Sequence, residues 1–295
     1  MSNDFIWDPK RNQIFNDSYG GYVTLTNKNN SDYAYEKDAS ASFMLDTKFS
    51  LALNDANVII WNGNFELING ELLVGSPNST FLPELLSVQT DNALTSFRNQ
   101  GKFYAHVMRF YSDRLFELSG DSLTSITATT RAVINGVYDV KDNAKLYIKL
   151  ESGRFNCDEG RVTLINNAVC EIATNDIDIL SYRFNLGMRG VTNENGNGSV
   201  NNAVMVFKPL SGDNPFDFRD DSRYYPEGLF NFEVVEGVKN GGRLEFYGSN
   251  MNAFQYTAMT SRRLLSINGA PINNEGLLRC YMRLTPTPVL VIEMV

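Results

Sequence analysis

The amino-acid sequence predicts an all-β protein, and three observations carry this prediction. Brief alternations of apolar and polar side chains fill residues 134–179, a period-two pattern that is typical of strands with one buried face. The chain has 295 residues and is 43% hydrophobic, so many short strands can share one sizeable core. Turn residues recur in steps of 8, 9, 7 and 8 residues, at Gly136, Ala144, Gly153, Gly160 and Ala168.

Strands this short must stack on neighbours or pair with them, because none can bury a core alone. We prefer a parallel β-solenoid of the right-handed β-helix type, since near-constant steps between turns are typical of stacked repeats. An antiparallel sandwich or a jelly roll is the alternative. Sequential hairpins through residues 134–179 would count against the solenoid.

The chain divides into three parts. Residues 1–37 are rich in Asn, Asp, Ser and Tyr and are expected to be irregular, with one strand at 22–26 and with Trp7 as an anchor to the body. The β-repeat body follows as residues 38–190. Its first strands are expected within 43–74, where Asn-Gly turns separate short apolar runs.

Two stretches of the body depart from simple alternation. Apolar residues within 82–97 have a roughly helical spacing, which predicts a short helix or a lateral loop. Residues 102–120 are apolar on both phases and predict a strand that is buried on both faces. This stretch holds the only histidine, His106, which we interpret as a packed side chain rather than a catalytic one.

A segment rich in Gly and Asn at 190–202 is the best candidate for a boundary. Strand patterns resume beyond it, so residues 203–295 form a C-terminal β region, in the same domain or as a second small β domain. The apolar run 289–295 would make an edge strand ready to pair with another chain. We therefore expect a homo-oligomer, with a trimer favoured.

Charge and composition argue against several classes of function. A net charge of −8 without a basic stripe argues against nucleic-acid binding, because neutralising phosphates requires clustered Lys and Arg. The apolar runs are shorter than the roughly 20 residues of a membrane helix, so we expect no membrane insertion. The N-terminus lacks the pattern of a Sec signal peptide. The three cysteines, Cys157, Cys170 and Cys280, lack metal spacing and are interpreted as small buried hydrophobes.

Motifs for nucleotide hydrolysis, dinucleotide redox, zinc proteolysis and α/β-hydrolase chemistry do not occur, and we expect no cofactor and no metal. Residues 153–172, GRFNCDEGRVTLINNAVCEI, resemble the rungs of right-handed parallel β-helix proteins of the autotransporter-passenger and phage-tailspike kind. In those proteins short strands alternate with Gly and Asn turns. The resemblance implies exposure on a virion or cell surface and contact with a glycan. Steps of 7 to 9 residues, however, depart from the longer coil of such families.

Asp176 and Asp178 are the candidates for catalytic carboxylates. They lie two apart on one expected strand, so both would point to the same face, as a polysaccharide-cleaving pair requires. Alternating Asp residues on an exposed strand more often serve solubility and edge protection. We therefore assign no catalytic residue.

The densest cluster of functional side-chain types lies at 211–228. Aromatic faces and charged groups together are the usual chemistry of sugar binding, with Arg recognising hydroxyl or carboxylate groups of an acidic glycan. The rings of Phe218, Tyr224 and Tyr225 would stack on sugar rings, while the charged residues would form hydrogen bonds with the glycan. The alternative is a surface loop whose rings, Phe216 and Phe218, are buried and whose charges are solvated. The predicted ligand-binding set is Asp217, Phe218, Arg219, Asp220, Asp221, Arg223, Tyr224 and Tyr225.

We therefore predict a non-enzymatic structural or adhesive protein on a virion or cell surface that binds a surface glycan or another surface receptor. Two alternatives stay open. One is a polysaccharide-cleaving hydrolase or lyase, and the other is an assembly component that contacts only other proteins. A cytoplasmic location also stays open.

Overall fold

The structure is a computed structural model, and it describes residues 5–20, 23–25, 37–38, 40–53, 57–75, 82–89, 94–113, 115–187, 201–219, 225–234, 240–272, 275–284 and 286–295. Helical residues in these ranges are α1 (Ala253–Ser261) and the 3-10 turns η1 (Asp17–Tyr19) and η2 (Glu275–Leu277). The prediction of an all-β protein is confirmed, because strands make up nearly all the regular structure in the described residues. They are β1 (Gln13–Asn16), β2 (Val23–Leu25), β3 (Ser42–Leu53), β4 (Val58–Trp61), β5 (Asn64–Val74), β6 (Leu85–Val88), β7 (Thr95–Phe97), β8 (Lys102–Ser112), β9 (Phe116–Leu118), β10 (Leu123–Ile134), β11 (Gly136–Val140), β12 (Lys145–Leu150), β13 (Phe155–Leu164), β14 (Val169–Ala173), β15 (Ile177–Leu186), β16 (Val204–Lys208), β17 (Phe230–Phe232), β18 (Arg243–Tyr247), β19 (Leu265–Ile267), β20 (Ala270–Pro271), β21 (Leu278–Arg283) and β22 (Val289–Met294).

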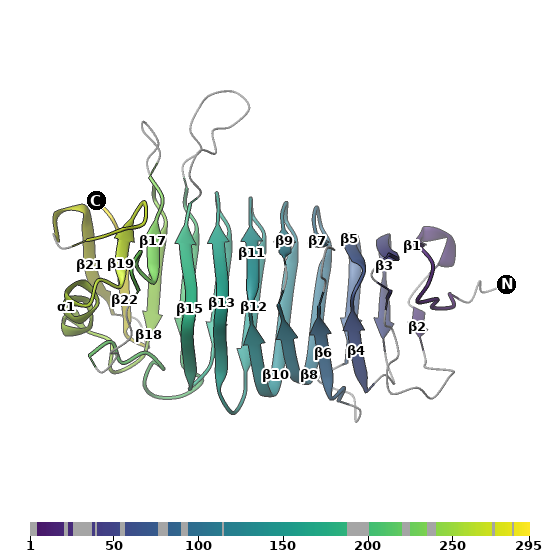
Figure 1. Ribbon diagram of the computed structural model, residues 1–295, viewed down its shortest axis with the longest axis horizontal. Helices are drawn as coiled ribbons and strands as arrows, with labels where there is room; N and C mark the ends of the chain where they lie inside the picture. The colour runs from purple at the N-terminus through teal and green to yellow at the C-terminus, as the bar shows by residue number, and fades with distance from the viewer. Residues whose placement is uncertain are drawn as a thin grey trace, which may run out of the picture.

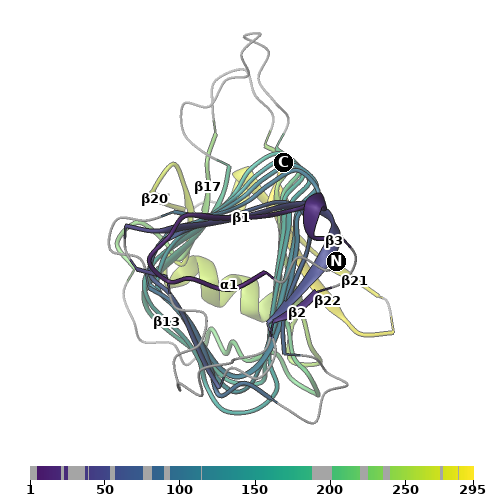
Figure 2. The ribbon, with the colours of Figure 1, turned by 90° about the vertical axis from the view of Figure 1, so that its right-hand side faces the viewer.

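Most strands pair in parallel with a strand that lies one turn of the chain further on. Leu123 of β10 lies opposite Lys145 of β12, and Lys145 lies opposite Val169 of β14. Gly136 lies opposite Gly160, 24 residues later. This separation equals three successive steps between the turn residues Gly136, Ala144, Gly153 and Gly160. One full circuit of the chain around the core therefore takes three short segments. The result is a long stack of strands around a central core (Figures 1 and 2).

The pairings close a ring of seven parallel strands, β5, β7, β9, β11, β13, β10 and β8. The ring closes because its long strands bend and pair with different neighbours before and after the bend. In β10, residues 123–128 pair with β12, whereas 132–133 pair with β13. Further strands extend the stack at both ends. Within 134–179, where every residue is described, the pairings are parallel and sequential hairpins are not formed.

The core lies inside the stack and is lined by one phase of each alternating strand. Neighbouring turns are in register, so side chains of the same kind stand above one another. Tyr138 lies opposite Phe116 with stacked rings 5.5 Å apart, and Phe207 lies opposite Phe246 with stacked rings 5.3 Å apart. Such aromatic pairs stabilise the stack beyond the burial of their area alone.

Two expectations for the body are wrong. The predicted helix or lateral loop at 82–97 contains β6 and β7, and each of these strands pairs with a strand on either side. Pairing on both sides overrides a spacing that was only roughly helical. β8 is not buried on both faces, because its exposure alternates along the strand. Tyr104 and His106 lie on its outer phase, and their rings made that phase look apolar in the sequence.

The expected edge strand at 289–295 is also wrong. β22 lies between β18 and β21 and pairs with both in antiparallel fashion. Within the part of the chain that the structure describes, β21 pairs with β22 alone, so β21 has the free edge. The candidate boundary at 190–202 lies mostly outside the described residues. β14 pairs with β16 and β15 with β17, so the stack of strands continues across it.

Helix α1 lies within the outline of the stack at its C-terminal end (Figures 1 and 2). The Asn252 side chain accepts a hydrogen bond from the Phe254 N–H, as an N-cap does. Gln255 and Met259 are buried. Because the last turn of strands would otherwise leave its core side chains open to water, the helix covers them.

Candidate functional site

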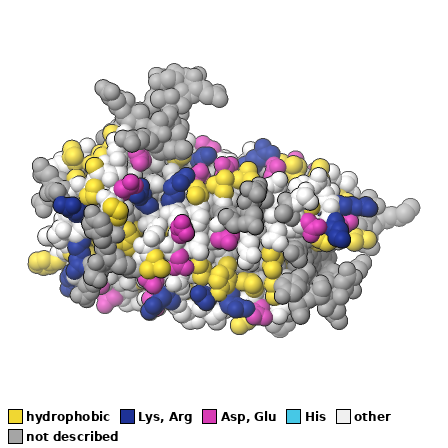
Figure 3. Space-filling view, viewed as in Figure 1, with side chains coloured by type: hydrophobic (Ala, Val, Ile, Leu, Met, Phe, Trp, Pro, Cys, Tyr) yellow, Lys and Arg dark blue, Asp and Glu magenta, His cyan; other side chains and the backbone are white. Residues whose placement is uncertain are grey.

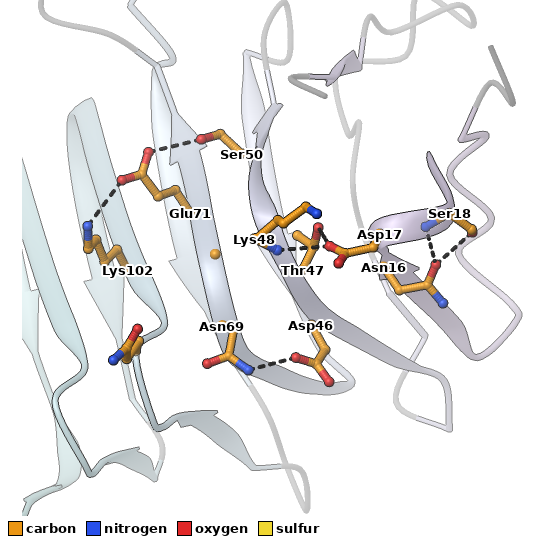
Figure 4. A pocket seen from close by; sticks show the side chains of 12 residues that line it. Asn16, Asp17, Ser18, Asp46, Thr47, Lys48, Ser50, Asn69, Glu71 and Lys102 are labelled. Atoms are coloured by element: carbon orange, nitrogen blue, oxygen red, sulfur yellow. Dashed lines mark hydrogen bonds and ion pairs between the residues drawn. The ribbon is translucent and has the colours of Figure 1, made fainter. Parts of the chain in front are cut away.

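A polar groove of about 830 Å³ opens at the N-terminal end of the stack, between η1, β3, β5 and the start of β8 (Figure 4). We call it the N-terminal groove. It is lined by Asn16, Asp17, Ser18, Asp46, Thr47, Lys48, Ser50, Asn69, Gly70, Glu71, Gln100 and Lys102.

The groove forms where β3 bends. Asp46 lies opposite Asn69, but the next residue of β3 that pairs with β5 is Ser50, which lies opposite Glu71. The three residues between them have no partner in β5 and form a bulge. Gly70 has a φ of 85°, and a Cβ there would lie 2.6 Å from the carbonyl oxygens of two of those bulged residues. A glycine is therefore needed for the close approach that shapes this corner.

Asp17 holds the bulge from the side of η1. Its Oδ1 accepts hydrogen bonds from the Thr47 hydroxyl at 2.7 Å and from the Lys48 N–H at 3.0 Å. These bonds, first the one from Thr47, lower the pKa of Asp17, so the carboxylate is ionised at neutral pH. The Lys48 side chain stands beside this carboxylate in Figure 4.

The remaining charged groups of the groove are paired along β3, β5 and β8. Asn69 Nδ2 donates to Asp46 Oδ1 at 2.8 Å, and the Ser50 hydroxyl donates to Glu71 Oε2 at 2.9 Å. Lys102 Nζ lies 3.5 Å from Glu71 Oε1. Each carboxylate keeps further lone pairs, and each ammonium has three donors. The groove therefore offers an alternating set of donors and acceptors, which is the chemistry that recognises sugar hydroxyls.

The residues predicted to bind a ligand at 211–228 have different environments in the structure. Asp217 and Arg219 pair with each other, with Nε 3.0 Å from Oδ1 and Nη2 3.1 Å from Oδ2. This hydrogen bond from Arg219 lowers the pKa of Asp217 to about 2. Phe218 and Tyr225 are buried, and the Tyr225 hydroxyl donates to the Ile179 carbonyl at 2.9 Å. Stacking of these two rings on a sugar is therefore wrong, because their faces are covered by the core.

Phe216 is buried as well, as the alternative reading of this loop expected. It lies 5.2 Å from Phe218 in a stacked pair and contacts Phe230 and Phe246. The loop is thus fastened to the core by its rings. The other predicted residues lie outside the described residues. They are Asp220, Asp221, Arg223 and Tyr224.

Asp176 and Asp178 do not form the expected pair on one strand. Asp176 precedes β15, which begins at Ile177, and its side chain accepts a hydrogen bond from Arg154 Nε at 3.1 Å. Asp178 lies within β15, opposite Asn156. The same-face argument therefore fails for Asp176, because it rested on both residues belonging to one strand.

Sequence reasoning missed the N-terminal groove. Its local signals were the Asn-Gly pair at Asn69 and Gly70 and the polar residues 46–48 inside an otherwise alternating strand. Both features indicate an interruption of a strand. Neither indicates that β3 and β5 lie next to η1, which depends on the length of the turn that connects them.

Comparisons of the chain with protein-family models, with curated proteins and with solved structures give no match. Among the described residues, no helix is both long enough and apolar enough to cross a membrane, and no group of three or more His, Cys, Asp or Glu side chains is placed to hold a metal ion. The function is therefore inferred from the geometry of this chain.

Proposed function

We propose that the protein is a non-enzymatic adhesive protein of solenoid architecture, exposed on a virion or cell surface, that binds a neutral glycan in the N-terminal groove. The solenoid assignment is supported by the spacing of paired residues in the middle of the chain. Partners there lie 21, 22 and 24 residues apart, at Lys102, Leu123, Lys145 and Val169. A coil of constant size produces parallel pairs whose partners are separated by a similar number of residues.

The observation that carries the glycan proposal is the lining of the groove. Three carboxylates and two ammonium groups alternate with amide and hydroxyl side chains over about 830 Å³, within the range of small-ligand sites. Three negative and two positive charges largely offset each other, which suits a hydroxyl-rich neutral ligand better than a highly charged one. Elsewhere on the side seen in Figure 3, charged side chains of both signs are interspersed.

Binding suits these carboxylates better than acid catalysis does. A glycosidase needs one carboxyl group that is protonated and can donate its proton to the leaving group. The hydrogen bonds to Asp17 lower its pKa, which favours the charged form of this carboxylate, and Glu71 forms an ion pair with Lys102. Ionised carboxylates accept hydrogen bonds from hydroxyls, which is what recognition requires.

The test is a glycan array followed by titration calorimetry on the glycans retained. The double variant Asp46→Ala with Lys48→Ala removes an acceptor and a donor from the groove. We expect it to weaken binding at least about tenfold, the effect of losing one or two charge-assisted hydrogen bonds. The control is Lys149→Ala with Glu151→Ala, an exposed ion pair on β12 and the turn after it.

Equal affinity of wild type and the groove variant, with the fold intact, would contradict the proposal. Release of reducing ends from the bound glycan by wild type would instead favour the polysaccharide-cleaving alternative. If the wild type retains no glycan on the array, the N-terminal groove is not a glycan site, and an assembly role is favoured.

The assembly role has one observation in its favour. At the C-terminal end, β21 has a free edge in the described part of the chain, and apolar side chains near it are exposed. Phe254 is 77% exposed and Leu284 is 87% exposed. Exposed strand edges and apolar groups together are typical of surfaces that pair with another chain. Self-association into a homo-oligomer, with a trimer favoured, is therefore part of the proposal.

A further inference from the structure

A second groove, of about 480 Å³, lies on β13 and β15 and is bordered by residues 225–228, which lead into β17 beside β15. We call it the Arg161 groove. Its charged side chains come from two strands and from the segment 225–228, and two apolar side chains form part of its wall. The residues that matter here are Glu159, Arg161, Leu180, Arg183, Pro226 and Glu227.

Two arginines on neighbouring strands line this groove. Arg161 of β13 is directly opposite Arg183 of β15 in the parallel register. Like charges directly opposite each other on neighbouring strands destabilise a sheet unless another charge compensates. Glu227 compensates Arg183, because the two side chains form an ion pair. Arg161 is exposed and makes no ion pair or side-chain hydrogen bond with the described residues.

Gly160 separates Arg161 from Glu159, which is also exposed and has no ion-pair partner in the described ranges. Gly160 has a φ of 129°, and a Cβ there would lie 1.8 Å from the Gly136 carbonyl oxygen, so no side chain can stand at this position. Two positions apart on β13, Glu159 and Arg161 therefore present to the groove a carboxylate and a guanidinium that have no ion-pair partner among the described residues.

The walls of the groove are firm and partly apolar. Leu180 is 54% exposed although it is a large aliphatic residue, and Pro226 in the segment 225–228 lines the same groove. The hydrogen bond from the Tyr225 hydroxyl to the Ile179 carbonyl fastens that segment to β15. A groove of this kind offers an apolar surface to the C–H face of a sugar ring.

We infer that the Arg161 groove binds a carboxylate-bearing sugar unit, such as a uronate. Arg161 donates a bidentate pair of hydrogen bonds to the sugar carboxylate, Glu159 accepts from ring hydroxyls, and the ring lies against Leu180 and Pro226. The inference rests on the proposed function in that both assign glycan binding to this protein. It adds a second subsite with a different specificity, about the middle of the chain rather than at its N-terminal end.

The test is titration calorimetry of the full chain with an oligouronide and with a neutral oligosaccharide of equal length. We expect Arg161→Gln to weaken oligouronide binding at least about tenfold and to leave the neutral ligand unaffected. Glu227→Gln should strengthen oligouronide binding severalfold, because it frees Arg183 from its ion pair. Arg154→Gln is the matched control. It removes the same positive charge from an exposed arginine, but Arg154 pairs with Asp176 outside the groove.

No saturable oligouronide binding by wild type, or equal affinity of wild type and Arg161→Gln, would overturn the inference. Weaker oligouronide binding by Glu227→Gln would contradict the role of the two arginines in binding the sugar carboxylate. Failure of the N-terminal groove variant to affect neutral glycans contradicts only the proposed function, because that variant leaves the Arg161 groove intact. The two outcomes are therefore separable.

Discussion

At the scale of single residues, Lys37 shows how a charge is used to close the N-terminal end. Its side chain is fully buried, and Nζ donates to the Asp8 carbonyl at 2.6 Å, the Arg11 carbonyl at 2.7 Å and Gln13 Oε1 at 2.8 Å. The ammonium also lies 4.6 Å from the centre of the Trp7 ring. One lysine thus ties the irregular first residues to the stack.

Lys37 should make stability depend on pH. Burial lowers its pKa from 10.5 to about 8, so between these values the unfolded chain binds more protons than the folded one. The free energy of unfolding should therefore rise as pH increases through that window, by up to about 3 kcal/mol from this group. Urea unfolding of wild type and Lys37→Met from pH 7 to 10.5 measures it. A difference between the two proteins that stays flat or falls with pH would contradict the assignment.

At the scale of elements, polar side chains at one corner form a ladder that links successive turns. Asn143 Nδ2 donates to Asp121 Oδ1 at 2.9 Å, Asn167 Nδ2 to Asn143 Oδ1 at 3.1 Å, and Asn202 Nδ2 to Asn167 Oδ1 at 3.3 Å. Amide groups can do this because each has both donors and an acceptor. The ladder therefore holds the register of neighbouring turns at a place where no strand pairing does so.

Replacing Asn143 by Asp tests the ladder with almost no change of shape. The variant loses the donor to Asp121 and sets two carboxylates next to each other. We expect it to lower the free energy of unfolding by about 1–2 kcal/mol at pH 7. Denaturant unfolding of the wild type and the variant at pH 7 measures this. Asn252→Asp is the matched control, because Asp serves equally well as an N-cap for α1.

At the scale of the whole molecule, the two ends of the stack are covered by different elements. The N-terminal end is covered by the segment that Lys37 and Trp7 fasten, with the Trp7 ring 5.1 Å from that of Phe43. The C-terminal end is covered by α1 and by the antiparallel pair β21 and β22. The covering at this end leaves an exposed edge and exposed apolar side chains, so it is the end from which we expect association.

Light scattering should show a species larger than the 33.1 kDa chain at micromolar concentration, with a trimer favoured. The double variant Phe254→Asp with Leu284→Asp should shift the mass to that of one chain, because charges replace the apolar contacts. Met108→Asp, on the side of the stack, is the control and should leave the mass unchanged. A wild-type protein that is monomeric at this concentration would refute the expectation.

The local pattern of the sequence determined much of the β architecture. Alternation and turn residues mark strands in residues 134–179 because burial of one face acts on each short segment separately. The cysteines were also predictable in part: Cys157 and Cys170 are buried, and Cys280 is partly exposed. Helix α1 was not predicted, since its role as a cover exists only once the last turn of strands is in place.

Only the tertiary structure decided how these segments combine. One circuit of the chain around the core takes three of the steps between turn residues, because Gly136 lies opposite Gly160. That register depends on residues 24 positions apart and not on local pattern. The same reason explains the sites. The 211–228 loop had the right side chains for a sugar, but packing against the core turned Phe218 and Tyr225 inward. Asp17, Asp46 and Glu71 are far apart in sequence, and the bend of β3 places them in one groove.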